Sequence, residues 1–366
     1  MRLTMPQEVV FTTDDAAGWR SVLPAEDSAF GSVEFARVAE RHQGVQARLY
    51  VLQDRTARVA YPFFTRPIRS ATPGFHVGGR LSDTTSPDFT GPLTRGVPPP
   101  ALAAEFPQRL STFFNRHHIV AEFIHLHPWK AFTKALRPPC LNFDREIVYV
   151  DLTRPEQQLW EGSFSHACRK NIKRSEREHV RIFEATTRAD IGEFHRIYVQ
   201  TMRERNALKH YFFSLDYFTD IFDDMRGSAR FVLAEYRDQV IAGTLYLHDR
   251  DDIYSYLGGA DLDFQHVRPT NAVIYDTIVW GQSQAKKRLI LGGGYSPDDG
   301  ILRFKASFSP LRADFLVYRC VHLPETYDAL CRSRSRSQGR DTQPNAYFPG
   351  YRDRPGSQDD ASVLTA

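Results

Sequence analysis

Residues 231–247, with the sequence FVLAEYRDQVIAGTLYL, contain two runs of β-branched and aromatic residues separated by a short charged segment at 237–239. This pattern predicts a β-hairpin. A similar arrangement occurs earlier in the chain, where 49–52 and 59–64 flank a charged turn at 54–56. In both places a helical segment precedes the hairpin and further strand-like runs follow it. The repeat predicts two related domains that each mix helices with strands.

The expected boundaries divide the 366 residues into a first α/β (α+β) domain at 1–150, a second at 151–331 and a tail at 332–366. This length agrees with two domains of roughly 150 residues. A stretch rich in Gly, Pro, Ser and Thr at 70–100 predicts a long surface connection. The tail is rich in Arg and Ser, and we expect most of it to be disordered. Within it, 347–352 has the aromatic residues needed to dock on the body.

The composition excludes several classes of protein. Hydrophobic residues make up 42% and charged residues 25% of the chain, which is typical of a globular protein and not of a fibrous one. The sequence contains no apolar stretch of the ~20 residues that a membrane helix needs. Its start lacks the apolar core of a signal peptide, so we expect a cytoplasmic protein. The net charge of +3 gives no strong overall field.

The cysteines and histidines give no metal signature. Cys140, Cys168, Cys320 and Cys331 lack the spacing of a disulfide framework or a zinc site, and we interpret them as reduced thiols. His125 and His127 alternate on a predicted strand and share a face, which is compatible with a metal ion. Because no third ligand follows at a suggestive spacing, we interpret them as partly buried strand histidines. We therefore predict no metal.

Common catalytic motifs are absent from the sequence. There is no G-x-S-x-G, H-E-x-x-H, Walker loop or C-x-x-C, which removes the sequence support for most enzyme classes. The densest charge cluster lies at 169–181. Arg169, Lys173 and Arg177 recur every fourth residue and would form one basic stripe on a helix. We predict that this stripe binds a phosphate-bearing partner. The alternative is a solvated helix face.

A further feature combines glycines with an aromatic and cationic pair. Three glycines at 292–294 end an apolar strand, where their small size allows a ligand to approach the backbone. Gly293 and Gly294 are therefore candidate substrate-binding residues. Phe304 and Lys305 follow, and together they offer a ring and a cation for a phosphate, a carboxyl group or the oxyanion of an acyl-transfer intermediate. The alternative is a purely structural turn.

These segments resemble the FemABX-like aminoacyltransferases and their acyltransferase relatives. In the second half the similarity lies in the strand, the glycine turn and the Phe304-Lys305 pair, together with 268–275 and 277–281. Elsewhere it lies in an ordered set of short segments, namely 61–68, 82–87, 91–93, 122–123, 126–128, 198, 201–203 and 211–212. The resemblance covers about residues 30–352, and it rests on the order of the whole set.

The resemblance implies two tandem GNAT-like acyltransferase domains. It also implies transfer of an amino acid from aminoacyl-tRNA to an amine, on a peptidoglycan precursor or a small natural product. Phe304 and Lys305 would lie at the acyl-transfer centre, while Thr201 and Arg203 would contact the acceptor and its phosphates. No cofactor is implied beyond the aminoacyl-tRNA co-substrate.

One local feature distinguishes between two possible acyl donors, acyl-CoA and aminoacyl-tRNA. Acetyl-CoA enzymes of this fold hold pyrophosphate with a loop of the form Q/R-x-x-G-x-G/A, whose N–H groups at a helix N-terminus meet the phosphates. The matching stretch at 265–270 has Arg268 and Thr270 in place of glycines, and Pro269 lacks an N–H. This favours aminoacyl-tRNA over acyl-CoA. An acyl-CoA N-acyltransferase and, because of the Arg/Ser tail, a non-catalytic RNA-binding protein stay open as alternatives.

The expected chemistry needs few protein groups. An aminoacyl ester is already activated, so the enzyme has to position the reactants, remove a proton from the attacking amine and stabilise the oxyanion. Lys305 is the candidate electrostatic group. Asp298 and Asp299 are the nearest acids in sequence that could accept the proton. Alternatively they only form the turn, and a carboxylate or phosphate of the substrate accepts the proton.

Overall fold

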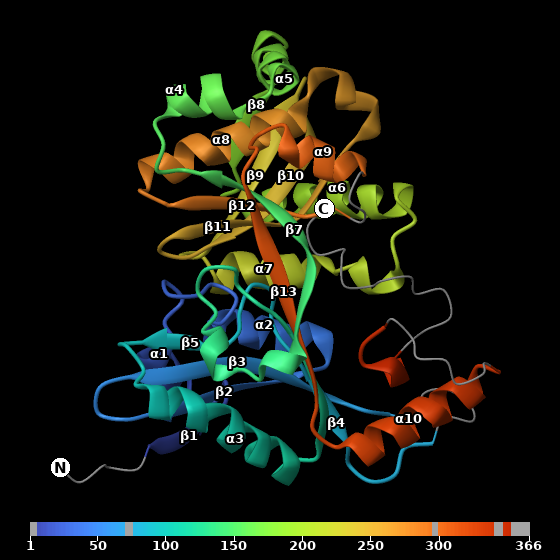
Figure 1. The fold of residues 1–366 in the computed structure, drawn as a ribbon. Helices are drawn as coiled ribbons and strands as arrows, with labels where there is room; N and C mark the ends of the chain where they lie inside the picture. Colours follow the sequence, from blue (N-terminus) through green and yellow to red (C-terminus); the bar gives the residue numbers. More distant parts are fainter. Residues whose placement is uncertain (1–5, 70–75, 295–298, 340–346, 353–366) are drawn as a thin grey trace. The chain divides into compact units, whose positions relative to one another are not determined.

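The computed structural model of the protein describes residues 6–69, 76–294, 299–339 and 347–352. These residues form two compact units, labelled by element in Figure 1. Unit 1 contains residues up to 25, residues 30–145 and those from 314 onward, whereas unit 2 contains 26–29 and 146–313. The division differs from the expected boundaries at 150 and 331, because residues from 314 onward return to the sheet of unit 1.

Unit 1 is built on a mixed sheet. Its strands are β1 (Gln7–Phe11), β2 (Gln46–Gln53), β3 (Arg58–Pro67), β4 (Ser82–Thr85), β5 (Leu93–Arg95), β6 (Ile119–His125) and β13 (Arg312–Val321). Strands β1 to β4 are antiparallel neighbours, β6 runs parallel to β4, and β13 runs antiparallel to β6. Its helices are α1 (Ala16–Val22), α2 (Val33–Gln43), α3 (Pro100–Arg116) and α10 (Pro324–Ser337), with the short turns η1 (Thr133–Ala135), η2 (Pro138–Cys140) and η6 (Gly350–Arg352).

Unit 2 is also built on a mixed sheet. Its strands are β7 (Leu141–Asp151), β8 (Arg181–Glu184), β9 (Ala229–Tyr236), β10 (Gln239–His248), β11 (Asp252–Ala260) and β12 (Arg288–Gly292). Its helices are α4 (Glu156–Gln158), α5 (His166–Arg177), α6 (Arg188–Glu204), α7 (Leu215–Asp224), α8 (Pro269–Ser283) and α9 (Gly300–Ala306). A π-helical turn, η3 (Leu159–Ser163), and the 3₁₀ turns η4 (Lys209–Tyr211) and η5 (Leu262–Val267) connect them.

The two sheets follow the same plan. In unit 2, β8 to β11 are antiparallel neighbours, β12 runs parallel to β11, and β7 runs antiparallel to β12. This repeats the order of β1, β2, β3, β4, β6 and β13 in unit 1. In each unit the last strand of the series comes from a distant part of the chain, since β7 precedes the rest of unit 2 and β13 follows it. The predicted repeat of two related α/β domains is confirmed.

Helix ends in unit 1 follow the local sequence. Ser32 is the N-cap of helix α2, and its side chain accepts a hydrogen bond from the backbone N–H of Phe35, as serine commonly does at this position. The helix ends at Gly44, where φ is +64° and a glycine is favoured. Helix α3 packs Phe106 and Phe113 around Tyr50 of β2, with ring centroids 5.7 and 5.5 Å apart. Within the described ranges, no helix combines the length and apolar character needed to cross a membrane.

Strand β9 explains how the predicted hairpin of unit 2 is buried. Val232 and Ala234 belong to the core that also contains Ile274 of α8. Phe231, which points the other way, packs its ring 5.0 Å from Phe194 of α6. Because successive side chains of a strand face opposite sides of the sheet, α8 and α6 cover its two faces. The nearly continuous apolar run in β9 is the result of this double burial.

The predicted surface connection at 70–100 is only partly correct. Residues 82–85 form β4, which pairs with β3, and 93–95 form β5. Strand β4 was not apparent in the sequence, because its buried residues are polar. Asp83 is fully buried, and its carboxylate accepts a hydrogen bond from Arg66 at 2.9 Å. Residues 70–75 lie outside the described part of the chain.

The Arg/Ser-rich segment is not disordered where the structure describes it. Residues 332–337 belong to α10, because arginine is a good helix former and Leu330 anchors the helix in the core of unit 1. The predicted docking of 347–352 is confirmed. Tyr351 donates a hydrogen bond to Asp83 at 3.1 Å, and the backbone N–H of Gly350 donates to Tyr327 at 3.1 Å. Residues 340–346 and 353–366 lie outside the described part.

Candidate functional site

The candidate site begins where two parallel strands of unit 2 stop pairing. Strands β11 and β12 pair at three positions, the last being Tyr254 with Ile290. Strand β11 continues to Ala260, while β12 ends at Gly292. Gly292 has a φ of +81°, a conformation that other residues rarely adopt. The first of the three glycines is therefore needed for the turn itself, as the structural alternative expects.

Lys305 returns to this turn. It lies near the end of α9 and is only 5% exposed. Its Nζ donates a hydrogen bond to the carbonyl oxygen of Gly293 at 2.9 Å. The structure thus brings together two of the predicted site residues, Lys305 and Gly293, although twelve positions separate them in the sequence. A buried ammonium group next to backbone dipoles can stabilise negative charge that develops beside it.

Gly294 is needed for a close contact with the start of α9. A Cβ atom at Gly294 would lie 2.5 Å from Oδ1 of Asp299. Asp299 is the N-cap of α9 and accepts a hydrogen bond from the backbone N–H of Leu302 at 2.6 Å. This carboxylate therefore holds the helix that carries Lys305. The other candidate proton acceptor, Asp298, lies outside the described residues.

Phe304 has a packing role. Its ring centroid lies 5.6 Å from that of Phe308, with the two rings nearly perpendicular. It packs, partly buried, against the core of unit 2. The aromatic side chain therefore fixes α9 against the body of the unit. Its predicted contribution to an aminoacyl pocket stays a prediction.

Thr201 and Arg203 are placed differently from each other. Thr201 is 4% exposed, and its hydroxyl donates to the carbonyl oxygen of Ile197 and accepts from the backbone N–H of Ala260, both at 3.0 Å. It therefore joins α6 to the end of β11. Arg203, two residues later, is exposed on α6. Only Arg203 has the exposure that contact with an acceptor phosphate requires, and its predicted role stays a prediction.

The basic helix forms as predicted, but its three cations differ. Arg169 donates to the carbonyl oxygens of Trp160 at 2.9 Å and Phe164 at 2.7 Å, so it closes the π-helical turn that precedes α5. Lys173 is exposed, with its Nζ 5.7 Å from the centroid of the Trp160 ring. Arg177 is exposed near the end of the helix. The stripe that ligands can reach thus consists of Lys173 and Arg177, and Arg169 supports it.

The start of α8 is the place where an acyl-CoA donor would bind its pyrophosphate. Arg268 is the N-cap residue, with φ +61° and ψ +43°, and Pro269 is the first residue of the helix. The first helical position therefore has no N–H to offer a phosphate. The Arg268 side chain makes no capping hydrogen bond to the helix.

Asn271 is a buried polar residue that the sequence reasoning did not single out. It lies one turn into α8, is 4% exposed and, among the described residues, has no hydrogen-bond partner for its Nδ2. It lies beside the thiol of Cys168 on α5. Burial raises the pKa of Cys168 to about 12, so this thiol is not a nucleophile at neutral pH. Asn271 does belong to a segment that carries the family resemblance, and that was the available signal.

The histidines His125 and His127 of unit 1 have protein partners. His125 Nδ1 lies 3.1 Å from Oδ1 of Asp88. His127 Nδ1 accepts hydrogen bonds from the backbone N–H groups of Trp129 and Lys130, both at 3.1 Å. Both residues are at least nine-tenths buried. The interpretation as a buried strand histidine is correct for His125, the last residue of β6, whereas His127 lies in the turn after the strand.

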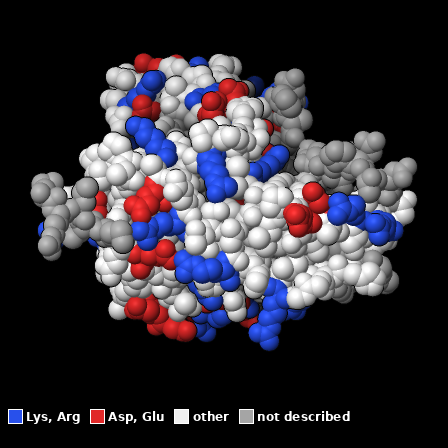
Figure 2. Space-filling model, turned by 60° about the horizontal axis from the view of Figure 1, so that its bottom comes forward, with Lys and Arg blue, Asp and Glu red and all other residues white. Residues whose placement is uncertain are grey.

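The surface does not present one charged field on the side shown in Figure 2. Basic and acidic side chains are interspersed over the described atoms of that face. This agrees with the net charge of +3. Attraction of a phosphate-bearing ligand would therefore depend on local groups such as Lys173 and Arg177, and not on long-range steering.

Comparison with known proteins supports a GNAT-like acyltransferase fold. The sequence profile of the acetyltransferase (GNAT) domain matches residues 162–305, which lie in unit 2 and end at Lys305. The structure resembles the crystal structure of FemX with a TM-score of 0.67 and 10% identity, over 88% of this chain and 99% of FemX. No curated protein matches the sequence.

Two further structures share the fold. A conserved protein of unknown function from Bacteroides thetaiotaomicron has a TM-score of 0.57 and 12% identity, over 87% of this chain and 100% of its own. The C-terminal domain of a predicted lysylphosphatidylglycerol synthetase from Agrobacterium fabrum has a TM-score of 0.52 and 13% identity, over 84% of this chain and 91% of its own. The predicted fold of GNAT-like α/β units is confirmed, and the match of residues 162–305 to an acetyltransferase domain supports the predicted acyltransferase class.

Proposed function

We propose that this acyltransferase uses aminoacyl-tRNA as its donor and forms an amide bond on an amine acceptor, either a peptidoglycan precursor or a small natural product. The amine attacks the carbonyl carbon of the aminoacyl ester, the ester C–O bond breaks, and the free tRNA 3′-terminal hydroxyl leaves. The amine loses its proton and the departing oxygen gains one. Because the ester is activated, positioning and charge stabilisation are sufficient for the reaction.

The start of α8 is the observation that carries the choice of donor. An acyl-CoA pyrophosphate is bound by consecutive N–H groups at a helix N-terminus. Here Pro269 removes the first of these donors, and Arg268 occupies the left-handed N-cap position where a glycine would leave room. This start is poorly suited to pyrophosphate. An aminoacyl-tRNA places no pyrophosphate there and does not need the missing donor.

Lys305 is the proposed oxyanion-stabilising group. An ammonium has three N–H donors, and the bond to Gly293 orients Nζ toward the turn at the end of β12. Burial at 5% exposure strengthens its interaction with a developing negative charge, because the surroundings screen that charge less than water does. The N-cap Asp299 and the packing of Phe304 would hold α9 in the required orientation.

The basic helix α5 is the proposed phosphate contact. Lys173 and Arg177 are exposed cations one helical turn apart. They would contact the tRNA backbone or the acceptor phosphate without reading bases. Arg203 on α6 is another exposed cation of unit 2 and the proposed acceptor contact.

The test is a donor competition. The purified protein is incubated with a pool of tRNAs charged with labelled amino acids and a small-molecule extract as the source of amines, and in parallel with labelled acetyl-CoA. We expect label to leave tRNA and appear in an amide product only with the extract present. Transfer from acetyl-CoA with none from tRNA would contradict the proposal.

An acyl-CoA N-acyltransferase is the second candidate. The observation that favours it is the profile match itself, because the matching domain is an acetyltransferase domain. A thermal shift with CoA and none with an acceptor-stem RNA would support this alternative. The acetyl-CoA arm of the competition tests it with the same preparation.

A further inference from the structure

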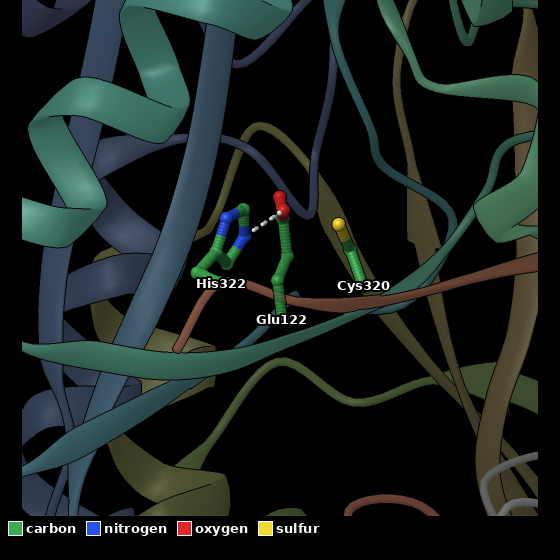
Figure 3. A group of neighbouring side chains, drawn as sticks. All are labelled: Glu122, Cys320 and His322. Atoms are coloured by element: carbon green, nitrogen blue, oxygen red, sulfur yellow. Dashed lines mark hydrogen bonds and ion pairs between the residues drawn. The ribbon is translucent and has the colours of Figure 1, made fainter. Parts of the chain in front are cut away.

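Three residues that can bind metals meet inside unit 1, whereas the site described above belongs to unit 2. Glu122 on β6 lies directly opposite Cys320 on β13 in the antiparallel register. His322 follows the end of β13. Figure 3 shows the three side chains pointing toward one another from the two strands. Their candidate ligand atoms all lie within 4.8 Å of one another.

The cluster is buried and its hydrogen bonding is incomplete. Glu122 is 1% exposed, Cys320 is 2% exposed, and the His322 side chain is 3% exposed. Nε2 of His322 lies 2.8 Å from Oε2 of Glu122. Oε1 of Glu122 and Nδ1 of His322 have no hydrogen-bond partner among the described residues. Such unpartnered atoms are costly in a protein interior, unless something binds them.

A fourth potential ligand adjoins the cluster. The thiol of Cys140, at the end of η2, lies within hydrogen-bonding reach of the Cys320 thiol. Cys140 is partly exposed and lines a pocket of about 530 Å³ between α3 and residues 133–140. All four residues belong to unit 1.

We propose that unit 1 binds a zinc ion through Glu122, Cys320 and His322, with Cys140 as the fourth ligand. Cysteine sulfur, histidine nitrogen and carboxylate oxygen are the ligands that zinc prefers, and four of them give its usual tetrahedral site. Each thiol loses its proton to solvent as its sulfur binds the ion. Ligand atoms around one zinc ion lie about 3 to 4 Å apart, so the three side chains have to close by about 1 Å.

The experiment measures zinc in the full-length protein. The purified, reduced chain is stripped with a chelator, reloaded with Zn²⁺, and passed over a desalting column before its metal content is measured. Cys320→Ser and His322→Gln are compared with Cys331→Ser, a control that removes a partly buried thiol of unit 1 outside the cluster. We expect about one zinc per chain in the wild type and the control. The two ligand variants should bind roughly 100-fold more weakly or worse.

A second measurement needs no variant. Loading the wild type with Co²⁺ should give a thiolate-to-cobalt charge-transfer band and the visible bands of tetrahedral coordination, and Zn²⁺ should abolish both. A wild type that retains no zinc and gives no such cobalt spectrum overturns the proposal. So does equal zinc retention in Cys320→Ser and His322→Gln, or a Cys140–Cys320 disulfide that forms quantitatively in place of the metal site. None of these results depends on the acyltransferase substrate.

Discussion

In unit 1, the fifth and sixth strands of the sheet bring Glu122 opposite Cys320, whereas the corresponding strands of unit 2 bring Leu289 opposite Val150. The strand order and directions are the same. Leu289 and Val150 are fully buried in a continuous apolar core, so this place in the fold does not need polar residues. The polar group in unit 1 is therefore a property of that unit, and it requires a separate explanation such as bound metal.

The segments that follow the fifth strand of each sheet also differ, and here unit 2 has the buried charged group. After β12, the glycine turn and α9 return Lys305 to Gly293. After β6, His127 closes a short turn by accepting hydrogen bonds from Trp129 and Lys130. Lys130 of unit 1 thus lies in a turn, whereas Lys305 of unit 2 is buried. The comparison teaches that the same strand plan carries a buried lysine at a glycine turn in unit 2 and a buried polar cluster between two strands in unit 1.

The largest expected effect tests the unit 2 side of this comparison. Lys305→Met keeps the length of the buried side chain but removes its charge, and it should lower transfer by about 100-fold or more, the effect of losing one oxyanion donor. Lys287→Met is the matched control, because Lys287 is exposed and pairs with Asp251. Single-turnover rates and thermal unfolding of both variants provide the measurement. Near-normal turnover of folded Lys305→Met would remove the assigned role.

A second prediction compares two buried carboxylates on the corresponding strands β4 and β11. Asp83 and Asp252 are both fully buried. Asp83 binds Arg66 and Arg352, whereas Asp252 binds Arg288 of β12 at 2.6 Å. Replacing either by Ala removes the carboxylate that neutralises a partly buried arginine and should cost about 3 to 5 kcal/mol of unfolding free energy. Denaturant unfolding provides the measurement.

The two variants should differ in which segment loosens. In Asp83→Ala, amide exchange should accelerate at Gly350, because the contacts of the 350–352 turn to the body include Asp83. In Asp252→Ala, exchange at 350–352 should stay unchanged, because its contacts lie in unit 2. Acceleration at Gly350 in both variants would show that the two carboxylates are not separate anchors.

The third prediction separates the cations of α5. Replacing both Lys173 and Arg177 by Gln should flatten the salt dependence of tRNA binding, since each lost phosphate contact reduces the slope by roughly 0.7 to 0.9. Arg169→Gln should leave the slope unchanged but lower the unfolding temperature, because Arg169 binds the carbonyl oxygens of Trp160 and Phe164. Filter binding at several salt concentrations tests this. An unchanged slope in the double variant would mean that Lys173 and Arg177 only form a solvated helix face.

Much of the fold could be predicted from the sequence, because the residues that follow an apolar pattern are also the buried ones. The hairpin in 231–247 forms from the two expected strand runs, and its burial follows from them. Strand β4 could not be found, because Asp83 is neutralised by arginines from distant parts of the chain. The end of unit 2 was misplaced for a similar reason, since the pairing of β13 with β6 joins residues almost 200 positions apart.

The candidate site was predictable only in part. The Phe304-Lys305 pair and the glycines are adjacent or nearly so in sequence, and Lys305 does reach Gly293. By contrast, the structural roles of Thr201 and Arg169 depend on backbone carbonyls and N–H groups that no sequence pattern reports. The cluster of Glu122, Cys320 and His322 is assembled by strand register alone. Spacing between cysteines could not reveal it.

The smallest expected effect concerns Arg203 of unit 2. It is exposed on α6, two residues after the buried Thr201. If it contacts an acceptor phosphate, the contact is partly screened by water, so Arg203→Ala should raise the acceptor KM by roughly two- to fivefold. The turnover number should stay nearly constant, because such a contact is equally strong in the ground state and the transition state. Steady-state kinetics over a range of acceptor concentrations measures both constants.

Arg205→Ala provides the matched control for this last effect, because Arg205 is an exposed arginine at the C-cap of the same helix. Both variants lose one positive charge, so a general electrostatic attraction of the acceptor would change KM equally in the two. A specific contact changes it only in Arg203→Ala, and raising the salt concentration should reduce the difference. Equal KM values for both variants and the wild type would mean that Arg203 lies outside the acceptor site, and that unit 2 binds the acceptor without it.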